Sequence, residues 1–207
     1  MKYIAHRINT VDDLSKVPKE FGIEVDLRDN DNDIIIQHDP FEQGENFKTF
    51  LKYYDHDFIV LNIKTDGIEF RVLDLLKLHG ITNYFFLDVA FPSIIKLIKF
   101  GEKNIALRFS EFESLENIKI IGKKVNWVWA DCFTKIPFNK KFYDVVKDYN
   151  LKVCFVSPEL QSQEEKINQY INIINRENFI IDAVCTKRHN ISKWKKLKTL
   201  KFTSNRY

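Results

Sequence analysis

Apolar and polar residues alternate in short runs along almost the whole chain, and the period switches between that of strands and that of helices. Runs rich in β-branched and aromatic residues predict strands at 3–7, 22–28, 33–39, 58–64, 83–90, 104–110, 124–133, 151–159 and 181–187. Helical spacing follows most of these runs, at 11–16, 47–54, 67–81, 92–101, 113–122, 139–150, 164–178 and 191–197. The chain is therefore expected to repeat a strand–helix unit.

The run at 33–39 interrupts this order, because it follows the second strand with only turn-forming residues between them. When it is set aside as an excursion, eight strands remain in 207 residues, which fits the lower size limit of a (β/α)₈ barrel. We expect an α/β fold, a compact TIM barrel forming one domain over 1–207. The alternative is an open doubly wound sheet, which needs a reversal of strand order. No G-x-G-x-x-G or Walker A pattern favours a nucleotide-binding fold.

The composition is that of a soluble globular protein, with 44% hydrophobic and 29% charged residues. A net charge of +3 is too small to indicate a nucleic-acid partner. No apolar run is long enough for a membrane span, and the first residues do not form a signal peptide. Cys132, Cys154 and Cys185 lie in apolar runs and are expected to be buried free thiols. We therefore expect a reduced, cytoplasmic protein without stable membrane insertion; its oligomeric state stays open.

Functional residues of a barrel of this kind lie at the carboxyl ends of its strands. This rule selects polar residues from each predicted strand end: His6, Arg7, Glu24, Asp26, Arg28, His38, Asp39, Asn62, Lys64, Asp88, Arg108, Asp131, Ser157, Glu159, Thr186 and Lys187. The first three strands and the excursion supply more than half of them. The polar site is therefore expected over these strands.

Two carboxylates of the second strand, Glu24 and Asp26, alternate with apolar residues, so their side chains share one face. An inward pair of this kind is costly unless something positive lies beside it. A divalent cation meets this need, and oxygen ligands suit Mg²⁺ or Ca²⁺ better than Zn²⁺. Arg28 or Lys64 meets it equally well, as part of an internal salt bridge. The residues alone leave both solutions open.

The third strand repeats this spacing with Asn62 and Lys64. An amide oxygen can ligate a hard cation, and a lysine beside it suits a phosphate oxygen, although Lys64 could instead pair with a carboxylate. His6 and His38 flank the acidic pair in sequence order. Two imidazoles at such strand ends can divide general-base and general-acid work near neutral pH.

Four pieces of sequence, in order, carry a resemblance to a known family. They are IAHR at 4–7, GIEVDLR at 22–28, IIIQHDP at 34–40 and LNIK at 61–64. Their order, H-R, E-x-D, H-D and then x-I-K, resembles that of the glycerophosphodiester phosphodiesterases and the wider phosphatidylinositol phospholipase C-like barrels. The resemblance covers the N-terminal third of the chain, and the remainder is similar only as a barrel pattern.

The resemblance implies a metal-dependent phosphodiesterase acting on a glycerophosphodiester or sugar-phosphate diester, either a small molecule or linked to a glycan. His6 and His38 would be the acid–base pair. Glu24, Asp26 and Asn62 would bind a divalent cation, Mg²⁺ or Ca²⁺. Arg7 and Lys64 would bind phosphate oxygens.

This chain departs from the family pattern at two positions. Ile8 stands where the family usually has glycine after H-R, and Asn62 stands where a third acidic ligand is usual. Losing one negative ligand should weaken metal binding, and Asp88 could substitute. Arg108 is a further candidate for a second phosphate, with a salt bridge to Glu111 or Asp88 as its alternative.

Two other functions stay open at this point. One is a metal-independent lyase of the phospholipase C type, in which Lys64 or Arg28 replaces the cation and the product is a cyclic phosphate. The other is a barrel that binds a phosphorylated ligand without turning it over. A sugar hydrolase is disfavoured, because Glu24 and Asp26 lie on one strand and cannot flank a glycosidic bond.

Overall fold

The computed structural model describes residues 1–31 and 33–198 and contains strands and helices in near-regular alternation. In chain order they are β1 (Lys2–Ala5), α1 (Val11–Ser15), β2 (Gly22–Asn30), β3 (Asp33–Ile36), β4 (Glu45–Asn46), α2 (Phe47–Phe50), β5 (Phe58–Ile63), α3 (Glu69–Leu78), β6 (Tyr84–Leu87), α4 (Phe91–Phe100), β7 (Ala106–Phe109), α5 (Glu116–Ile121), β8 (Trp127–Ala130), α6 (Lys140–Asp148), β9 (Lys152–Val156), α7 (Ile167–Arg176), β10 (Ala183–Thr186) and α8 (Ile191–Trp194). Short 3₁₀ turns follow β9 and β10 and precede α7. Each predicted strand and helix is present, mostly with shorter bounds.

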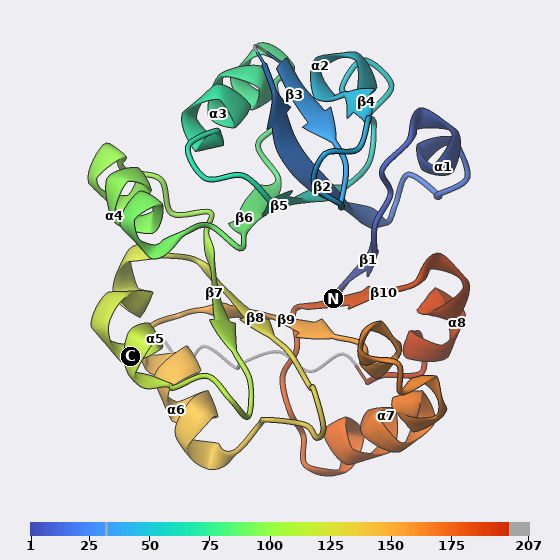
Figure 1. Cartoon of the computed structure of the whole chain (residues 1–207). Helices are drawn as coiled ribbons and strands as arrows, with labels where there is room; N and C mark the ends of the chain where they lie inside the picture. Colours follow the sequence, from blue (N-terminus) through green and yellow to red (C-terminus); the bar gives the residue numbers. More distant parts are fainter. Residues whose placement is uncertain (32, 199–207) are drawn as a thin grey trace.

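Eight parallel strands form a ring with the helices outside it (Figure 1). β1 pairs with both β2 and β10, β5 lies between β2 and β6, and β7 to β10 pair in sequence order. A parallel bridge between Phe86 and Ile105 joins β6 to β7, and the Phe86 N–H donates to the Asn104 carbonyl at 2.8 Å. The expected TIM barrel is confirmed. A doubly wound sheet is excluded, because the first and last strands are neighbours.

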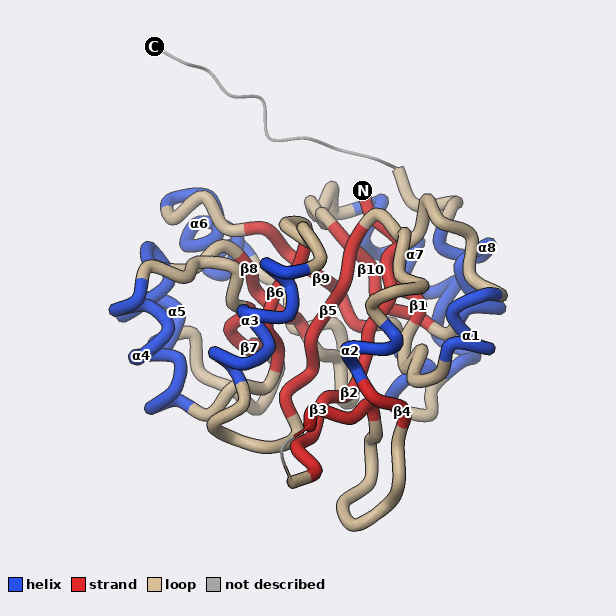
Figure 2. The backbone as a smooth tube through the Cα atoms, turned by 90° about the horizontal axis from the view of Figure 1, so that it is seen from above, coloured by secondary structure: helices blue, strands red, loops and turns tan. Residues whose placement is uncertain are grey.

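β3 and β4 are the predicted excursion, and they lie outside the ring next to α2 (Figure 1). β3 runs antiparallel to the end of β2, with Leu27 opposite Ile36, and β4 runs antiparallel to β3. The loop between β3 and β4 extends beyond the body of the barrel (Figure 2). This loop carries His38, so the excursion brings a candidate residue back to the carboxyl end of β2.

Aromatic and aliphatic side chains fill the barrel interior, since every second residue of each strand points inward. The rings of Phe58 and Phe85 lie 5.4 and 4.9 Å from that of Trp127, and Trp129 belongs to the same cluster. Gly22 makes room for them, because a Cβ atom there would lie 3.0 Å from the Phe58 carbonyl oxygen. Both tryptophans are therefore core residues.

A second, larger core lies between the strands and the helices. Phe109 of β7 stacks on Phe142 of α6 with ring centroids 4.5 Å apart. The helix begins with Asn139, whose side chain accepts from the Phe142 N–H at 3.0 Å. Thr10 caps α1 in the same way, with its side chain accepting from the Asp13 N–H. The stacked rings attach α6 to β7, and the two caps fix where α6 and α1 begin.

The three cysteines are buried and free, as expected. Cys154 and Cys185 lie in the barrel interior, and Cys132 lies in the outer core. Over the described ranges 1–31 and 33–198, no helix is long and apolar enough to cross a bilayer.

Candidate active site

Polar side chains of the first strands meet at the carboxyl end of the barrel. Parallel pairing of β2 with β5 sets Asp26 opposite Asn62, and Lys64 follows directly after β5. His6 and Arg7 follow β1, where the His6 N–H donates to the Thr186 carbonyl at 2.9 Å. Register alone thus brings together candidates that lie far apart in the sequence.

Glu24 lies at the centre of this group and is fully buried. It accepts the Arg7 backbone N–H at 2.7 Å and the Asn62 Nδ2 at 2.9 Å, and His6 Nε2 lies 3.8 Å away. Burial, and after it the charge of Asp26, raise the pKa of Glu24 to about 7. Among the described residues its only ion-pair partner is His6. The carboxylate therefore lacks a full cationic partner.

His6 is mostly buried beside this carboxyl group. Burial, and after it the neighbouring charge of Arg7, lower the pKa of His6 to about 4. The charges of Lys64 and His38 act in the same direction, while Asp26 opposes them. His6 is consequently neutral near pH 7, the state in which an imidazole can accept a proton.

Asp26 is the better neutralised member of the acidic pair. Lys64 Nζ lies 3.4 Å from it and Arg7 Nε lies 3.7 Å from it. The side chain of Asn9 donates to its carboxylate at 2.9 Å and accepts its backbone N–H at 3.1 Å. Sequence reasoning missed Asn9, although its place two residues after Arg7 is a usable signal. Of the two cations considered for this pair, Lys64 contacts a carboxylate.

Arg28 has different partners. Its Nε and Nη2 donate to the His38 carbonyl at 3.2 and 2.7 Å, and its Nη1 donates to the Lys64 carbonyl at 3.3 Å. The idea that Arg28 neutralises the acidic pair is therefore wrong, because its guanidinium is committed to backbone oxygens. The ring of His38 is partly exposed, and its Nδ1 lies 2.8 Å from the Asp39 carboxylate.

The strand ends of the second half form a separate ionic group around Arg108. Its guanidinium donates to Asp88 at 2.7 Å, to Asp131 at 2.6 Å and to Glu113 at 3.0 Å. The expected partner Asp88 is thus present. Glu111 instead accepts from the backbone N–H groups of Phe133 and Lys135, in the loop after β8. Three carboxylates around one guanidinium leave this group with net negative charge. The phosphate-binding role of Arg108 stays a prediction.

Asp88 links the two halves, since its carboxylate also lies 3.7 Å from Lys64. Asp88 and Arg7 both have a φ of 56°, in the left-handed region that non-glycine residues seldom adopt. Such backbone strain gathers at functional sites, where surrounding contacts hold it. Asp88 already forms ion pairs with Lys64 and Arg108, so its carboxylate is less available to a metal than the Asn62 Oδ1.

The residues present fit a hard divalent cation. Glu24, Asp26 and Asn62 offer only oxygen atoms as metal ligands, and the buried Asn62 Oδ1 has no hydrogen-bond partner among the described residues. A cation there would pair with that oxygen and would supply the charge that Glu24 lacks. The described ranges hold no group of three or more histidine, cysteine or acidic side chains arranged for a metal. The donor set therefore has two carboxylates and depends on the amide for its third ligand.

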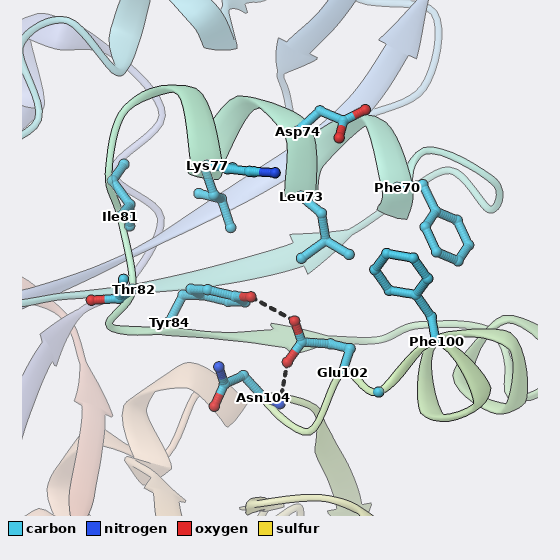
Figure 3. A pocket seen from close by; sticks show the side chains of 12 residues that line it. Phe70, Leu73, Asp74, Lys77, Ile81, Thr82, Tyr84, Phe100, Glu102 and Asn104 are labelled. Atoms are coloured by element: carbon cyan, nitrogen blue, oxygen red, sulfur yellow. Dashed lines mark hydrogen bonds between the residues drawn. The ribbon is translucent and has the colours of Figure 1, made fainter.

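A groove of about 510 Å³ between α3 and α4 lies elsewhere (Figure 3). Phe70 and Phe100 are in edge-to-face contact at one end of it, with ring centroids 5.3 Å apart, and Tyr84 donates to Glu102 at 2.6 Å on its floor. Tyr84 begins β6, so the groove is at the opposite end of that strand from Asp88. None of the site candidates lines it.

The fold and the placement of the site define a parallel α/β barrel with a polar centre at its carboxyl end. Solved structures with this fold include a glycerophosphodiester phosphodiesterase from Agrobacterium tumefaciens, with a TM-score of 0.66 and 10% identity over 91% of this chain and 97% of that one. A putative glycerophosphodiester phosphodiesterase from Galdieria sulphuraria has a TM-score of 0.69 and 13% identity over 93% and 96%. A putative glycerophosphoryl diester phosphodiesterase from Agrobacterium tumefaciens has a TM-score of 0.62 and 12% identity over 95% of this chain and 97% of that one.

No family model matches the sequence, and no curated protein matches it either. At identities of 10–13%, the likeness to the solved structures establishes the fold, which is the barrel of the glycerophosphodiester phosphodiesterases. The four sequence pieces that suggested this family lie on the strands and loops that form the site.

Proposed function

We propose that this protein is a metal-dependent phosphodiesterase that hydrolyses a glycerophosphodiester or sugar-phosphate diester. The observation that carries the proposal is the neutral, buried His6 beside the oxygen ligands of Glu24, Asp26 and Asn62. This arrangement lies at the end of the barrel where such folds carry their chemistry. The fold is shared with phosphodiesterases, which supports the same reaction class here.

Each residue has a role in this proposal. His6 takes or returns a proton at the reacting oxygens, and His38 performs the complementary transfer. The bond from His38 Nδ1 to Asp39 orients that ring and leaves its Nε2 for the substrate. Arg7 and Lys64 bind the non-bridging phosphate oxygens. These assignments follow the motif positions and the contacts among Glu24, Asp26 and their neighbours.

A divalent cation bound by Glu24, Asp26 and Asn62 would neutralise charge that develops on the phosphate group. The ligands suit Mg²⁺ or Ca²⁺ because all are oxygens. The substrate would be a small or glycan-linked diester, with no nucleic-acid partner, since the net charge is only +3. A cytoplasmic location agrees with three free cysteines but rests on the sequence alone.

A metal-independent lyase is the second candidate, and one observation favours it. Lys64 and Arg7 already lie 3.4 and 3.7 Å from Asp26, as they would in a site without a metal. Glu24 argues against it, because among the described residues only His6 lies within ion-pair distance of that buried carboxyl group, and His6 is neutral near pH 7.

The test is hydrolysis of bis(4-nitrophenyl) phosphate with Mg²⁺, Ca²⁺, Mn²⁺ or a chelator. We expect metal-dependent turnover in the wild type and its loss in His6→Ala and Glu24→Ala. Arg176→Gln, which changes an exposed residue of α7, is the matched control and should keep full activity. Turnover that persists in chelator and in Glu24→Ala would indicate the lyase. Absence of turnover with every metal would contradict a phosphodiesterase acting on this substrate.

A further inference from the structure

Arg28 occupies a position in the site that the proposed mechanism does not use. It lies on β2, two residues beyond Asp26, and its side chain is half-buried. Among the described residues, its three hydrogen bonds end on two carbonyl oxygens, those of His38 and Lys64. These two residues belong to different segments, since Lys64 follows β5 and His38 lies in the loop between β3 and β4. One guanidinium therefore joins the backbones of two proposed functional residues.

The loop that carries His38 has few other attachments to the barrel. The Gln37 N–H donates to the Asp26 carbonyl at 2.9 Å, and the Gln37 side chain bonds to Gln43 and to the His38 N–H inside the loop. The His38 ring itself is held by Asp39, whose side chain is 71% exposed. In the described part of the chain, Arg28 supplies the only side-chain bonds from a barrel strand to the His38 backbone.

The chemistry of arginine suits this task. The guanidinium is planar and presents donors in a fixed fork, so it can hold two acceptors at a set separation. Its bonds to neutral carbonyls are charge-assisted and hence stronger than ordinary ones. Arg28 forms no ion pair of its own among the described residues, so its charge is directed at these oxygens. A lysine has a single point of donation and cannot reproduce the fork.

We propose that Arg28 is a positioning residue that fixes His38 and Lys64 relative to each other and to β2. Its catalytic consequence rests on the proposed phosphodiesterase function. Displacing a catalytic group by about 1 Å costs about 10²-fold in rate. Arg28→Ala is therefore expected to lower kcat by about 100-fold. Metal affinity should stay unchanged, because Arg28 bonds to none of the proposed metal ligands.

The experiment has two independent readouts. The first is steady-state hydrolysis of bis(4-nitrophenyl) phosphate by wild type, Arg28→Ala, Arg28→Lys and the control Arg176→Gln. We expect kcat to fall in Arg28→Ala and to fall less in Arg28→Lys. Added methylguanidinium at millimolar concentration should restore kcat in Arg28→Ala. A residue with a merely structural role would show neither this rescue nor a kcat loss at unchanged metal affinity.

The second readout is amide hydrogen exchange of the folded proteins, which needs no activity. In Arg28→Ala and in Arg28→Lys, exchange in 37–44 and 64–67 should rise about tenfold or more, with the remaining strands unchanged. Unchanged exchange in both segments would overturn the proposal, whatever the kinetics. If wild type proves inactive, the proposed function fails, and the exchange result still decides whether Arg28 holds these segments. Arg28→Lys serves this purpose should Arg28→Ala fail to fold.

Discussion

Replacing Glu24 with glutamine should reveal a pH dependence of stability that the wild type conceals. Glu24 has its pKa raised from 4.5 to about 7, and His6, 3.8 Å away, has its pKa lowered from 6.5 to about 4. In the folded metal-free protein near pH 5.5, the proton therefore resides on Glu24, whereas in the unfolded chain it resides on His6. The two states bind equal numbers of protons at this pair.

The magnitudes follow from proton linkage. The raised pKa of Glu24 contributes stability that is present below pH 4.5 and lost as pH rises through about 7. The lowered pKa of His6 contributes stability that is present above pH 6.5 and lost as pH falls through about 4. Each effect is about 3 kcal/mol, at 1.36 kcal/mol per pH unit. Their slopes cancel between about pH 4.5 and 6.5, so the wild-type contribution of this pair is flat.

Single substitutions should separate the two slopes. Glu24→Gln removes the Glu24 contribution and keeps that of His6. The free energy of unfolding of this variant, relative to that of wild type, should therefore rise by about 3 kcal/mol as pH increases from about 4 to 7. His6→Gln leaves only the Glu24 effect and should fall by a similar amount over the same range. Glutamine fits at position 24, because its oxygen can accept the Arg7 N–H and, once the Asn62 amide group turns over by about 180°, Asn62 Oδ1 can accept the glutamine N–H.

The assay is urea unfolding in chelator at several pH values between about 4.5 and 7.5, with free energies obtained by linear extrapolation. Differences from wild type at each pH remove the contributions of all other titrating groups. Glu20→Gln, at an exposed carboxylate, should give a curve parallel to wild type. The reasoning is refuted if Glu24→Gln also runs parallel to wild type, or if both site variants slope in the same direction.

Three further outcomes are expected. Asn62→Asp should destabilise the metal-free protein, because it replaces the hydrogen bond to Glu24 by repulsion between two carboxylates. The same variant should bind Mg²⁺ or Ca²⁺ about tenfold or more tightly than wild type. Metal titrations followed by thermal unfolding measure both effects, and weaker metal binding would contradict the assigned ligand set. Phe142→Ala should lower the free energy of unfolding by about 3–5 kcal/mol, measured in urea, because the ring is fully buried and stacked on Phe109. Asn139→Ala should cost about 1 kcal/mol in the same assay through loss of the α6 cap, whereas no change would rule out a capping role.

The order of elements was accessible from sequence because each strand and helix has its own periodicity. The excursion at β3 was also visible, since turn-forming residues separate it from β2 by too few positions for a helix. The count of eight strands favoured a closed ring over an open sheet, but it could not identify the pairs that close it, which are β1 with β10 and the bridge of Phe86 with Ile105. Such pairings are non-local and leave no mark in either segment alone.

The candidate site was predicted most fully where one strand supplies alternating residues. Glu24 and Asp26 were placed on one face by the two-residue repeat, and the structure confirms that both are buried. Partners across strands could be predicted only as alternatives, such as Asp88 or Glu111 for Arg108, since the choice between them requires the register. Arg108 meets carboxylates from three different segments, and Arg28 turns to backbone carbonyls, a choice that residue type does not encode.

The hydrogen bond from the His6 N–H to the Thr186 carbonyl has a consequence for the order of folding. It joins the first strand to the last, so almost the entire chain must leave the ribosome before His6 gains this partner. Until then β1 has an open edge, and the chemistry encoded in the N-terminal third cannot be fully assembled. Contacts of such long sequence separation slow folding and leave strand edges exposed. Partly synthesised chains should therefore lack the assembled site and be prone to aggregation.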